Sequence, residues 1–254
     1  MNHGPRSAAL RSARAERGVT LLEMLVAITL LSLLSGGILI ALHAGLNGMS
    51  KVKTRLMDNR RLAGAQRIVE QQVAAFVPVV TDCLPDGDRP PVRIPFFQGE
   101  PQSMRFVSAY SLKDGWRGLP QILEFQVIPG EPGAGLRLVV NERPYAGAPS
   151  AGIYCTGMRT DETTGAPAPI FRPIEIGPQS FVLADRLAYC RFLFLERGRN
   201  PAEDRWTPHW FLPRWPAAVR IEMAPVESDA VRLRPVTATI PLHVTAEPGR
   251  TYAP

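Results

Sequence analysis

The most prominent feature of the hydropathy pattern is a long apolar segment near the N-terminus. No Asp, Glu, Lys or Arg occurs between residues 24 and 50, and the most apolar block covers residues 24–42. As a helix rising about 1.5 Å per residue, this segment would be roughly 40 Å long, which exceeds a hydrocarbon core of about 30 Å. The pattern therefore predicts a membrane-spanning helix over about residues 22–44.

The more polar region that follows keeps a helical period. Its apolar residues recur at spacings of three and four, at Leu62, Ala65, Val69, Val73 and Phe76. Pro78 is then expected to end or kink the helix. The sequence predicts one helix over residues 19–78, with a first half in the membrane and an amphipathic second half packed on a head domain over residues 79–254.

The head is predicted to consist of short strands. Period-2 or β-branched patterns occur at residues 103–110, 121–128, 135–141, 187–196, 217–223 and 236–244, and residues 129–135 carry a turn signal. Cys190, Phe192 and Phe194 share one face of their strand. No segment of helical crossover length separates the strands, so we expect antiparallel pairing throughout. The fold class is α+β.

Two parts of the head are expected to be irregular, and one aromatic cluster is expected in the core. Residues 79–101 and 142–180 are rich in Pro and Gly, which favours loops. Trp206, Trp210 and Trp215 occur within ten residues. We expect at least two of them to pack inside the head rather than to anchor an interface.

Half of the net charge of +6 lies in the first 18 residues, and the other half is spread over the rest of the chain. Residues 1–18 carry four arginines and Glu16, a net of +3, and the remaining 25 basic and 22 acidic residues give another +3. No concentrated basic face is present, so we expect no nucleic-acid partner. The N-terminal arginines fit a cytoplasmic flank that directs everything after residue 45 to the far side of the membrane.

The three cysteines leave two interpretations open. Cys83, Cys155 and Cys190 form no CxxC pair, so zinc and thioredoxin-like sites are not indicated. In an extracytoplasmic compartment, one disulfide with one remaining thiol is expected. Three buried, reduced thiols are the alternative, and spacing does not determine any connectivity.

No arrangement of residues in the sequence points to catalysis. HExxH, GxSxG, P-loop and GxGxxG patterns do not occur. The acidic loop with Asp82, Asp86 and Asp88 fails the EF-hand pattern when it is counted from Asp86, because Pro91 stands at the sixth position, where glycine is required. His209 lies near Asp204 in sequence, and we interpret both as structural. We therefore expect no catalytic residue, metal site or cofactor.

The carboxylate of Glu23, at the front of the apolar segment, requires an explanation. An acid at the centre of a bilayer costs about 2.5–3.5 kcal/mol, and less near a helix end. A signal peptide cleaved near "LHAG" (residues 42–45) and a plain anchor both leave Glu23 without a role. Cleavage between Gly18 and Val19 would instead place a free amine one helical turn from Glu23.

The stretch "RGVTLLEMLVAITLLSLLSGGIL", residues 17–39, resembles the class III signal of type IV pilins and pseudopilins. The resemblance implies a leader over residues 1–18 that a prepilin peptidase removes after Gly18. It also implies N-methylation of Val19, where the family more often has Phe or Met. Glu23 would form a salt bridge with the N-terminus of a neighbouring subunit during fibre assembly.

A second resemblance lies near the C-terminus. "YCRFLFLERGRNPAEDRWTPHW" followed by "LPRWPAAVRIEM", within residues 189–223, resembles the J-type minor pseudopilin of type II secretion systems, with an extra "RWP" inside the motif. This implies a single-pass protein of the bacterial inner membrane with a periplasmic head. Its partners would be I- and K-type minor pseudopilins, the major pseudopilin and secreted cargo. The alternatives are a minor pilin of a type IV pilus and, from another class, a membrane-anchored periplasmic enzyme or binding module.

Overall fold

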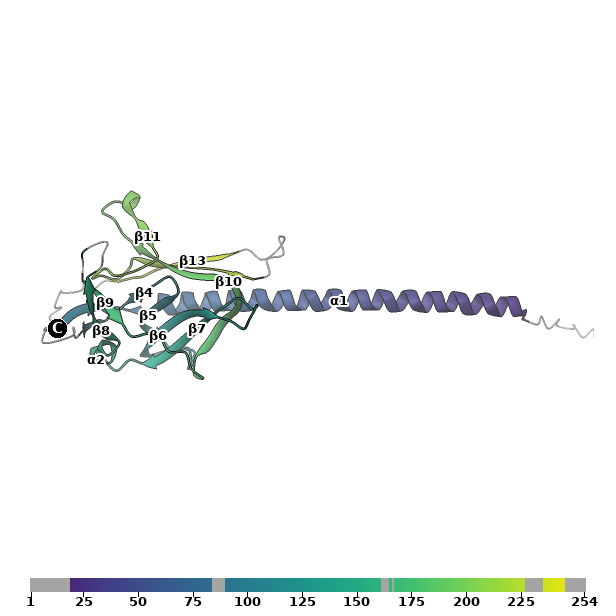
Figure 1. Cartoon of the computed structure of the whole chain (residues 1–254), viewed down its shortest axis with the longest axis horizontal. Helices are drawn as coiled ribbons and strands as arrows, with labels where there is room; N and C mark the ends of the chain where they lie inside the picture. The colour runs from purple at the N-terminus through teal and green to yellow at the C-terminus, as the bar shows by residue number, and fades with distance from the viewer. Residues whose placement is uncertain (1–18, 84–89, 161–164, 166, 227–234, 245–254) are drawn as a thin grey trace, which may run out of the picture. The chain divides into compact units, whose positions relative to one another are not determined.

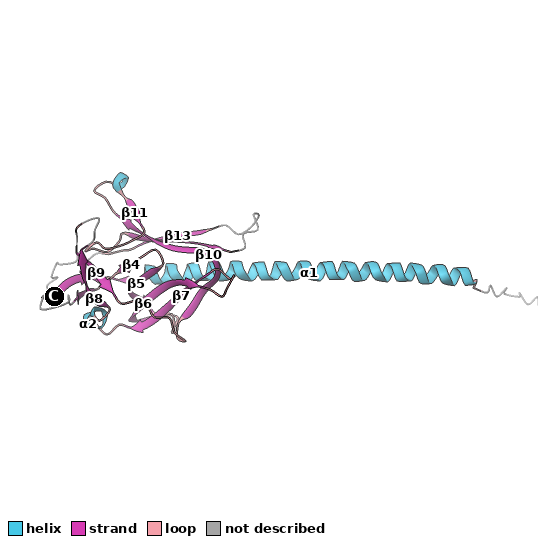
Figure 2. Cartoon of the chain, in the orientation of Figure 1, coloured by secondary structure: helices cyan, strands magenta, loops and turns pink. Residues whose placement is uncertain are grey.

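The computed structural model describes residues 19–83, 90–160, 165, 167–226 and 235–244, without the side chains of residues 50–59. The chain divides into two compact units, Met1–Leu56 and Met57–Pro254, which are described separately. The helix α1, Leu21–Ala74, contributes its first part to one unit and its last turns to the other. Figure 2 separates this helix from the strands by colour. An apolar N-terminal helix followed by a mostly antiparallel sheet is the α+β arrangement predicted from the sequence.

The last turns of α1 bury the predicted amphipathic face. Leu62, Ala65, Val69 and Val73 are each at most 6% exposed. The prediction that the helix extends to residue 78 was wrong, because α1 ends at Ala74 and Phe76–Val77 forms the short strand β1. At β1 the backbone forms hydrogen bonds with the strand β5 (Ser103–Tyr110) instead of continuing the helix.

The head contains a nine-stranded sheet in the order β1-β5-β6-β7-β10-β12-β13, with β4 paired to β5 and β11 to β10. All its pairings are antiparallel, as predicted. The remaining members are β4 (Gln98–Gly99), β6 (Arg117–Pro129), β7 (Leu136–Pro144), β10 (Phe181–Glu196), β11 (Arg205–Thr207), β12 (Ala218–Pro225) and β13 (Val236–Pro241).

The strand β10 joins the two halves of this sheet. Its first half pairs with β7, from Phe181 opposite Val140 to Leu187 opposite Leu136. Its second half pairs with β12, and the register shifts between the two halves, where Arg186 has a φ of 56°. Bulges of this kind bend a strand and increase its twist. The sheet can therefore enclose the last turns of α1, with β13 above them and β6 and β7 below in Figure 1.

The core between helix and sheet is rich in aromatic rings. Phe106 stacks on Phe125 with ring centroids 5.9 Å apart, and Phe125 meets Phe192 edge-on at 6.4 Å. Cys190, Phe192 and Phe194 are all buried, which confirms the predicted alternation. Trp210 and Trp215 are buried as well, which confirms that at least two of the tryptophans belong to the interior.

The two regions expected to be irregular contain regular structure, so that prediction was wrong. The first holds the strands β2 (Val80–Cys83), β3 (Val92–Pro95) and β4. The second holds the helix α2 (Ala148–Gly152) and the paired strands β8 (Cys155–Thr160) and β9 (Pro167–Phe171). The prolines and glycines in these segments made the short elements look like loops in the sequence. Together with Val107 and Ile122 of the main sheet, these elements form a second apolar cluster. A single-turn 3-10 helix, η1 (Pro201–Glu203), precedes β11.

Candidate functional site

The N-terminal end of α1 is built by a capping interaction. The hydroxyl Oγ1 of Thr20 accepts a hydrogen bond from the Glu23 backbone N–H at 3.2 Å, and the Thr20 carbonyl accepts the N–H of Met24 at 3.2 Å. Thr20 is therefore the N-cap, and Glu23 is the third residue of the helix. The pattern Thr-x-x-Glu is a capping box, a signal that was present in the sequence but was not used in the predictions.

The position of Glu23 gives its carboxylate two favourable environments. An acid in the first turn is stabilised by the helix dipole by about 0.3–1 kcal/mol. The Glu23 side chain is exposed, so it can also reach a group outside its own helix. Val19 is the first residue that the structure describes and is 66% exposed, whereas Gly18 lies outside the described residues.

The helix surface behind Glu23 is apolar and uncovered within the chain. Leu21–Met49 is long and apolar enough to cross a membrane, with a mean hydropathy of 2.5, and none of it is buried inside the protein. Two of its hydroxyls bond within the helix, from Thr29 to the Val26 carbonyl and from Ser32 to the Ile28 carbonyl, both at 2.8 Å. Such local bonds satisfy polar groups inside a lipid bilayer, where no water is present to form hydrogen bonds with them. Lipid or neighbouring helices must cover this surface.

The cysteines of the head fall into two classes. Cys83 at the end of β2 and Cys155 at the start of β8 form a disulfide with a Cα–Cα distance of 5.4 Å. Cys190 is a buried free thiol in β10, and burial raises its pKa to about 12. A thiol of that kind is unreactive at neutral pH, because the thiolate is the reactive form.

A buried polar row crosses four strands on the opposite face of the sheet from α1. In register, Gln98 of β4, Arg105 of β5, Glu124 of β6 and Asn141 of β7 are successive neighbours. Arg105 Nη1 donates to Gln98 Oε1 at 2.7 Å, and Asn141 Nδ2 donates to Glu124 Oε2 at 3.0 Å. Burial lowers the pKa of the Arg105 guanidinium, and the charge of Glu124 opposes that effect.

This polar row also holds the segment that follows β9. Arg105 Nη2 donates to the Arg172 carbonyl at 2.9 Å, and Asn141 Nδ2 donates to the Glu175 carbonyl at 2.8 Å. The row is therefore a structural clamp in the interior of the head. Nothing in the sequence predictions indicated it.

The residues considered for catalysis do not form a pair. Asp204 accepts the Gly198 backbone N–H at 3.0 Å, and the ring of His209 stacks on Phe211 at 5.6 Å. In the described part of the chain, no group of three His, Cys, Asp or Glu residues is arranged to hold a metal ion. Asp86 and Asp88, of the rejected calcium loop, lie outside the described residues.

Comparison with protein families identifies one match in the chain. Residues 13–39 match the prokaryotic N-terminal methylation motif, which contains Gly18, Val19 and Glu23. No curated protein matches the sequence significantly. The motif implies processing by a prepilin peptidase and assembly with other pilins, and it points to a structural protein. Together with the exposed apolar helix, which fits a membrane anchor, and the antiparallel sheet, it supports a pilin-like protein.

Proposed function

We propose that this protein is a minor pseudopilin of a type II secretion system, similar to the J-type. Its precursor is inserted in the inner membrane with the head in the periplasm. Prepilin peptidase cuts between Gly18 and Val19, and the amine of Val19 is methylated. At the tip of the pseudopilus the protein joins I- and K-type minor pseudopilins, initiates assembly of the major pseudopilin and supports protein export.

The observation that carries this proposal is the position of Glu23 in the first turn of an uncovered apolar helix. After cleavage, Val19 would carry a free amine one turn before this carboxylate. In an isolated helix both charges would lie at the edge of the lipid. In a bundle of helices, the carboxylate of one subunit pairs with the amine of another, so assembly removes an electrostatic cost that the single helix retains.

The J-type assignment rests on the C-terminal resemblance. The segments that carry it fall on β10, β11 and β12, and β11 and β12 each pair directly with β10 in the sheet. The resemblance therefore covers one continuous piece of the head rather than scattered segments. Deletion of the gene should abolish export of secreted enzymes and leave pilus-dependent motility intact. The reverse phenotype would identify a minor pilin of a type IV pilus.

The direct test of processing is the mass and N-terminal sequence of the protein from its native membranes. We expect a chain that starts at Val19, with one added methyl group. A chain that starts near Gly45 would identify a signal peptide and a released head. An uncut chain would identify a plain anchor and would leave a periplasmic enzyme or binding module as the better explanation.

The capping box makes a sharper test of Glu23 possible. Glutamine at the third helical position supports a capping box as glutamate does, but carries no charge. If the charge serves assembly, Glu23→Gln and Glu23→Leu should both be processed and both lose incorporation into the fibre at least tenfold. If Glu23→Gln assembles like the wild type, local capping is sufficient to explain the residue.

A further inference from the structure

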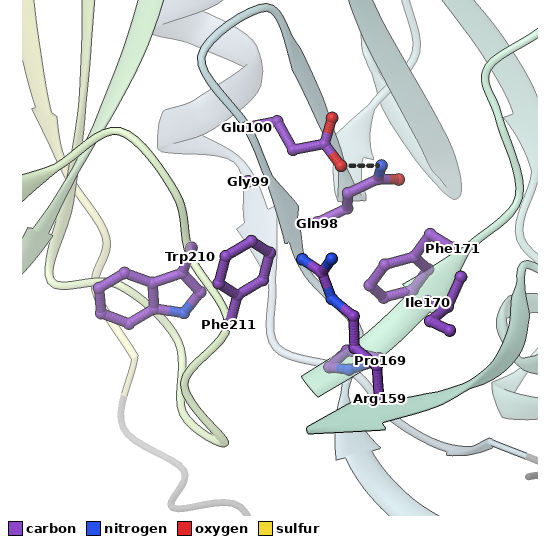
Figure 3. Close-up of a pocket in the computed structure, with 9 residues that line it drawn as sticks. All are labelled: Gln98, Gly99, Glu100, Arg159, Pro169, Ile170, Phe171, Trp210 and Phe211. Carbon is purple, nitrogen blue, oxygen red and sulfur yellow. Dashed lines mark hydrogen bonds between the residues drawn. The ribbon is translucent and has the colours of Figure 1, made fainter. Parts of the chain in front are cut away.

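A pocket of about 210 Å³ lies on the head where three segments distant in the sequence meet (Figure 3). One wall consists of β4 and Glu100, which follows it, and residues 169–171 of β9 form another. Trp210 and Phe211, which follow β11, close a third side, and Arg159 of β8 extends into the space. Gln98 belongs to the polar row as well, and the Phe171 ring lies against that row, with its centroid 6.0 Å from the Arg105 guanidinium carbon.

The walls of this pocket are fixed by interactions outside it. The Gly99 carbonyl accepts the Trp210 backbone N–H at 2.8 Å, and Trp210 Nε1 donates to the Arg214 carbonyl at 2.6 Å. Gln98 is held by the buried Arg105. A preformed pocket loses little conformational entropy when it is filled, so it is suited to binding.

Arg159 supplies a cation with available donors. Its guanidinium carbon lies 4.9 Å from the centroid of the Phe211 ring, which orients the group without using its in-plane N–H donors. In Figure 3 this group points between Phe211 and Phe171. The ion pairs of the described residues all involve other arginines. Arg159 is therefore placed to bind a carboxylate beside aromatic surface.

Glu100 gives the pocket a direction. Its carboxylate accepts hydrogen bonds from Gln98 Nε2 at 3.1 Å and from Ser103 Oγ at 2.8 Å, so it is fixed at the opposite wall. A second carboxylate is repelled there, whereas a backbone N–H is accepted. The two charges favour a peptide segment whose carboxylate faces Arg159 and whose backbone amide faces Glu100.

The size of the pocket indicates what fills it. Sites for small molecules usually have volumes of about 300–1,000 Å³, which is larger than the roughly 210 Å³ present here. At protein interfaces, single anchor side chains fill small, well-packed pockets from which water is excluded. We propose that this pocket receives an acidic anchor residue on an extended segment of another subunit of the same assembly. This inference rests on the proposed function.

The test uses photo-crosslinking in the full-length protein, expressed at its native level. p-Benzoylphenylalanine replaces Ile170, which lines the pocket and is 42% exposed. We expect one adduct with another fibre subunit, in which the crosslinked peptide contains Asp, Glu or a C-terminal carboxylate. Arg159→Glu should lower the adduct yield at least tenfold, and changing the partner's acid to Lys should restore it. Arg117→Glu, the same charge change at an exposed residue of β6, should have no effect.

Four results would overturn the inference: no adduct, an adduct that Arg159→Glu leaves unchanged, a crosslinked peptide without a carboxylate, or an adduct with a secreted protein. The N-terminus of the chain is determined in the same samples. A chain that starts at Val19 but gives no adduct contradicts only the pocket inference. A chain that is not cut at Val19 contradicts the proposed function itself.

Discussion

Arg105 Nε donates a hydrogen bond to Glu124 Oε1 at 2.9 Å, and the side chains of both residues are almost completely buried. The two residues are direct cross-strand neighbours in β5 and β6. A buried ion pair of this kind contributes little net stability compared with an apolar pair, but removal of one partner leaves an uncompensated buried charge. Replacing one residue of the pair should therefore destabilise the head more than replacing both.

We predict that Arg105→Met lowers the free energy of unfolding by about 3–5 kcal/mol, because Glu124 then lacks its counter-charge. The double variant Arg105→Met, Glu124→Leu should show a much smaller decrease in the free energy of unfolding. Urea unfolding of the full chain in detergent, followed by tryptophan fluorescence, reports on the head, because all four tryptophans lie there. Equal losses for the single and double variants would show that the hydrogen bonds to Gln98 and the Arg172 carbonyl dominate.

The disulfide should contribute strongly to the stability of the head. Cys83 and Cys155 are separated by 72 residues, and the chain-entropy model assigns about 4 kcal/mol to closing a loop of that size. Cys83→Ser, Cys155→Ser should therefore unfold at clearly lower urea than the wild type. The wild type treated with reductant in urea should have the same unfolding midpoint as this variant. The midpoint of Cys190→Ala should be lowered by reductant as much as that of the wild type. An unchanged unfolding midpoint in the double serine variant would contradict the prediction.

The buried thiol of Cys190 should make stability fall in alkali. Its pKa is raised to about 12 in the folded head, from an ordinary value of 9.0. Above pH 9 the unfolded thiol loses its proton while the folded thiol keeps it, so the unfolded state binds fewer protons and is favoured. Between pH 8 and pH 10 this group should cost about 1.4 kcal/mol of stability. The loss is measured as the difference in pH dependence between the wild type and Cys190→Ala, and parallel curves would refute it.

Gly99 should tolerate no side chain. A Cβ at this position would lie 2.8 Å from the Phe194 ring and 2.8 Å from Trp210 Cβ, and both neighbours are buried. Gly99→Ala should therefore destabilise the head by about 1–3 kcal/mol through overpacking. Gly118→Ala is the matched control, because its nearest neighbour is the exposed Trp116 ring at 3.6 Å. A neutral Gly99→Ala would mean that β4 moves away from Phe194 freely.

The pattern of apolar residues was sufficient to predict the elements that bury a continuous face. Leu62, Ala65, Val69 and Val73 revealed the inward side of α1, and the alternation around Phe192 revealed that of β10. The helix end and the short strands β2, β3, β8 and β9 were missed for a common reason. Their backbone bonds join segments that are short, rich in Pro or Gly, or, like β1 and β5, distant in the sequence. Local propensity carries little information about such pairings.

By itself the sequence determined the N-terminal methylation motif, because Gly18, Val19, Glu23 and the apolar segment lie close together along the chain. A helix is recognised from apolar residues that recur every three or four positions, and its capping box is local too. The tertiary structure alone decided which two cysteines pair, how Arg105 and Glu124 meet, and that Arg159, Glu100 and Phe211 share one pocket. In each case the residues lie at least 19 positions apart in the chain, and only the register of the strands and the packing of the sheet bring them together.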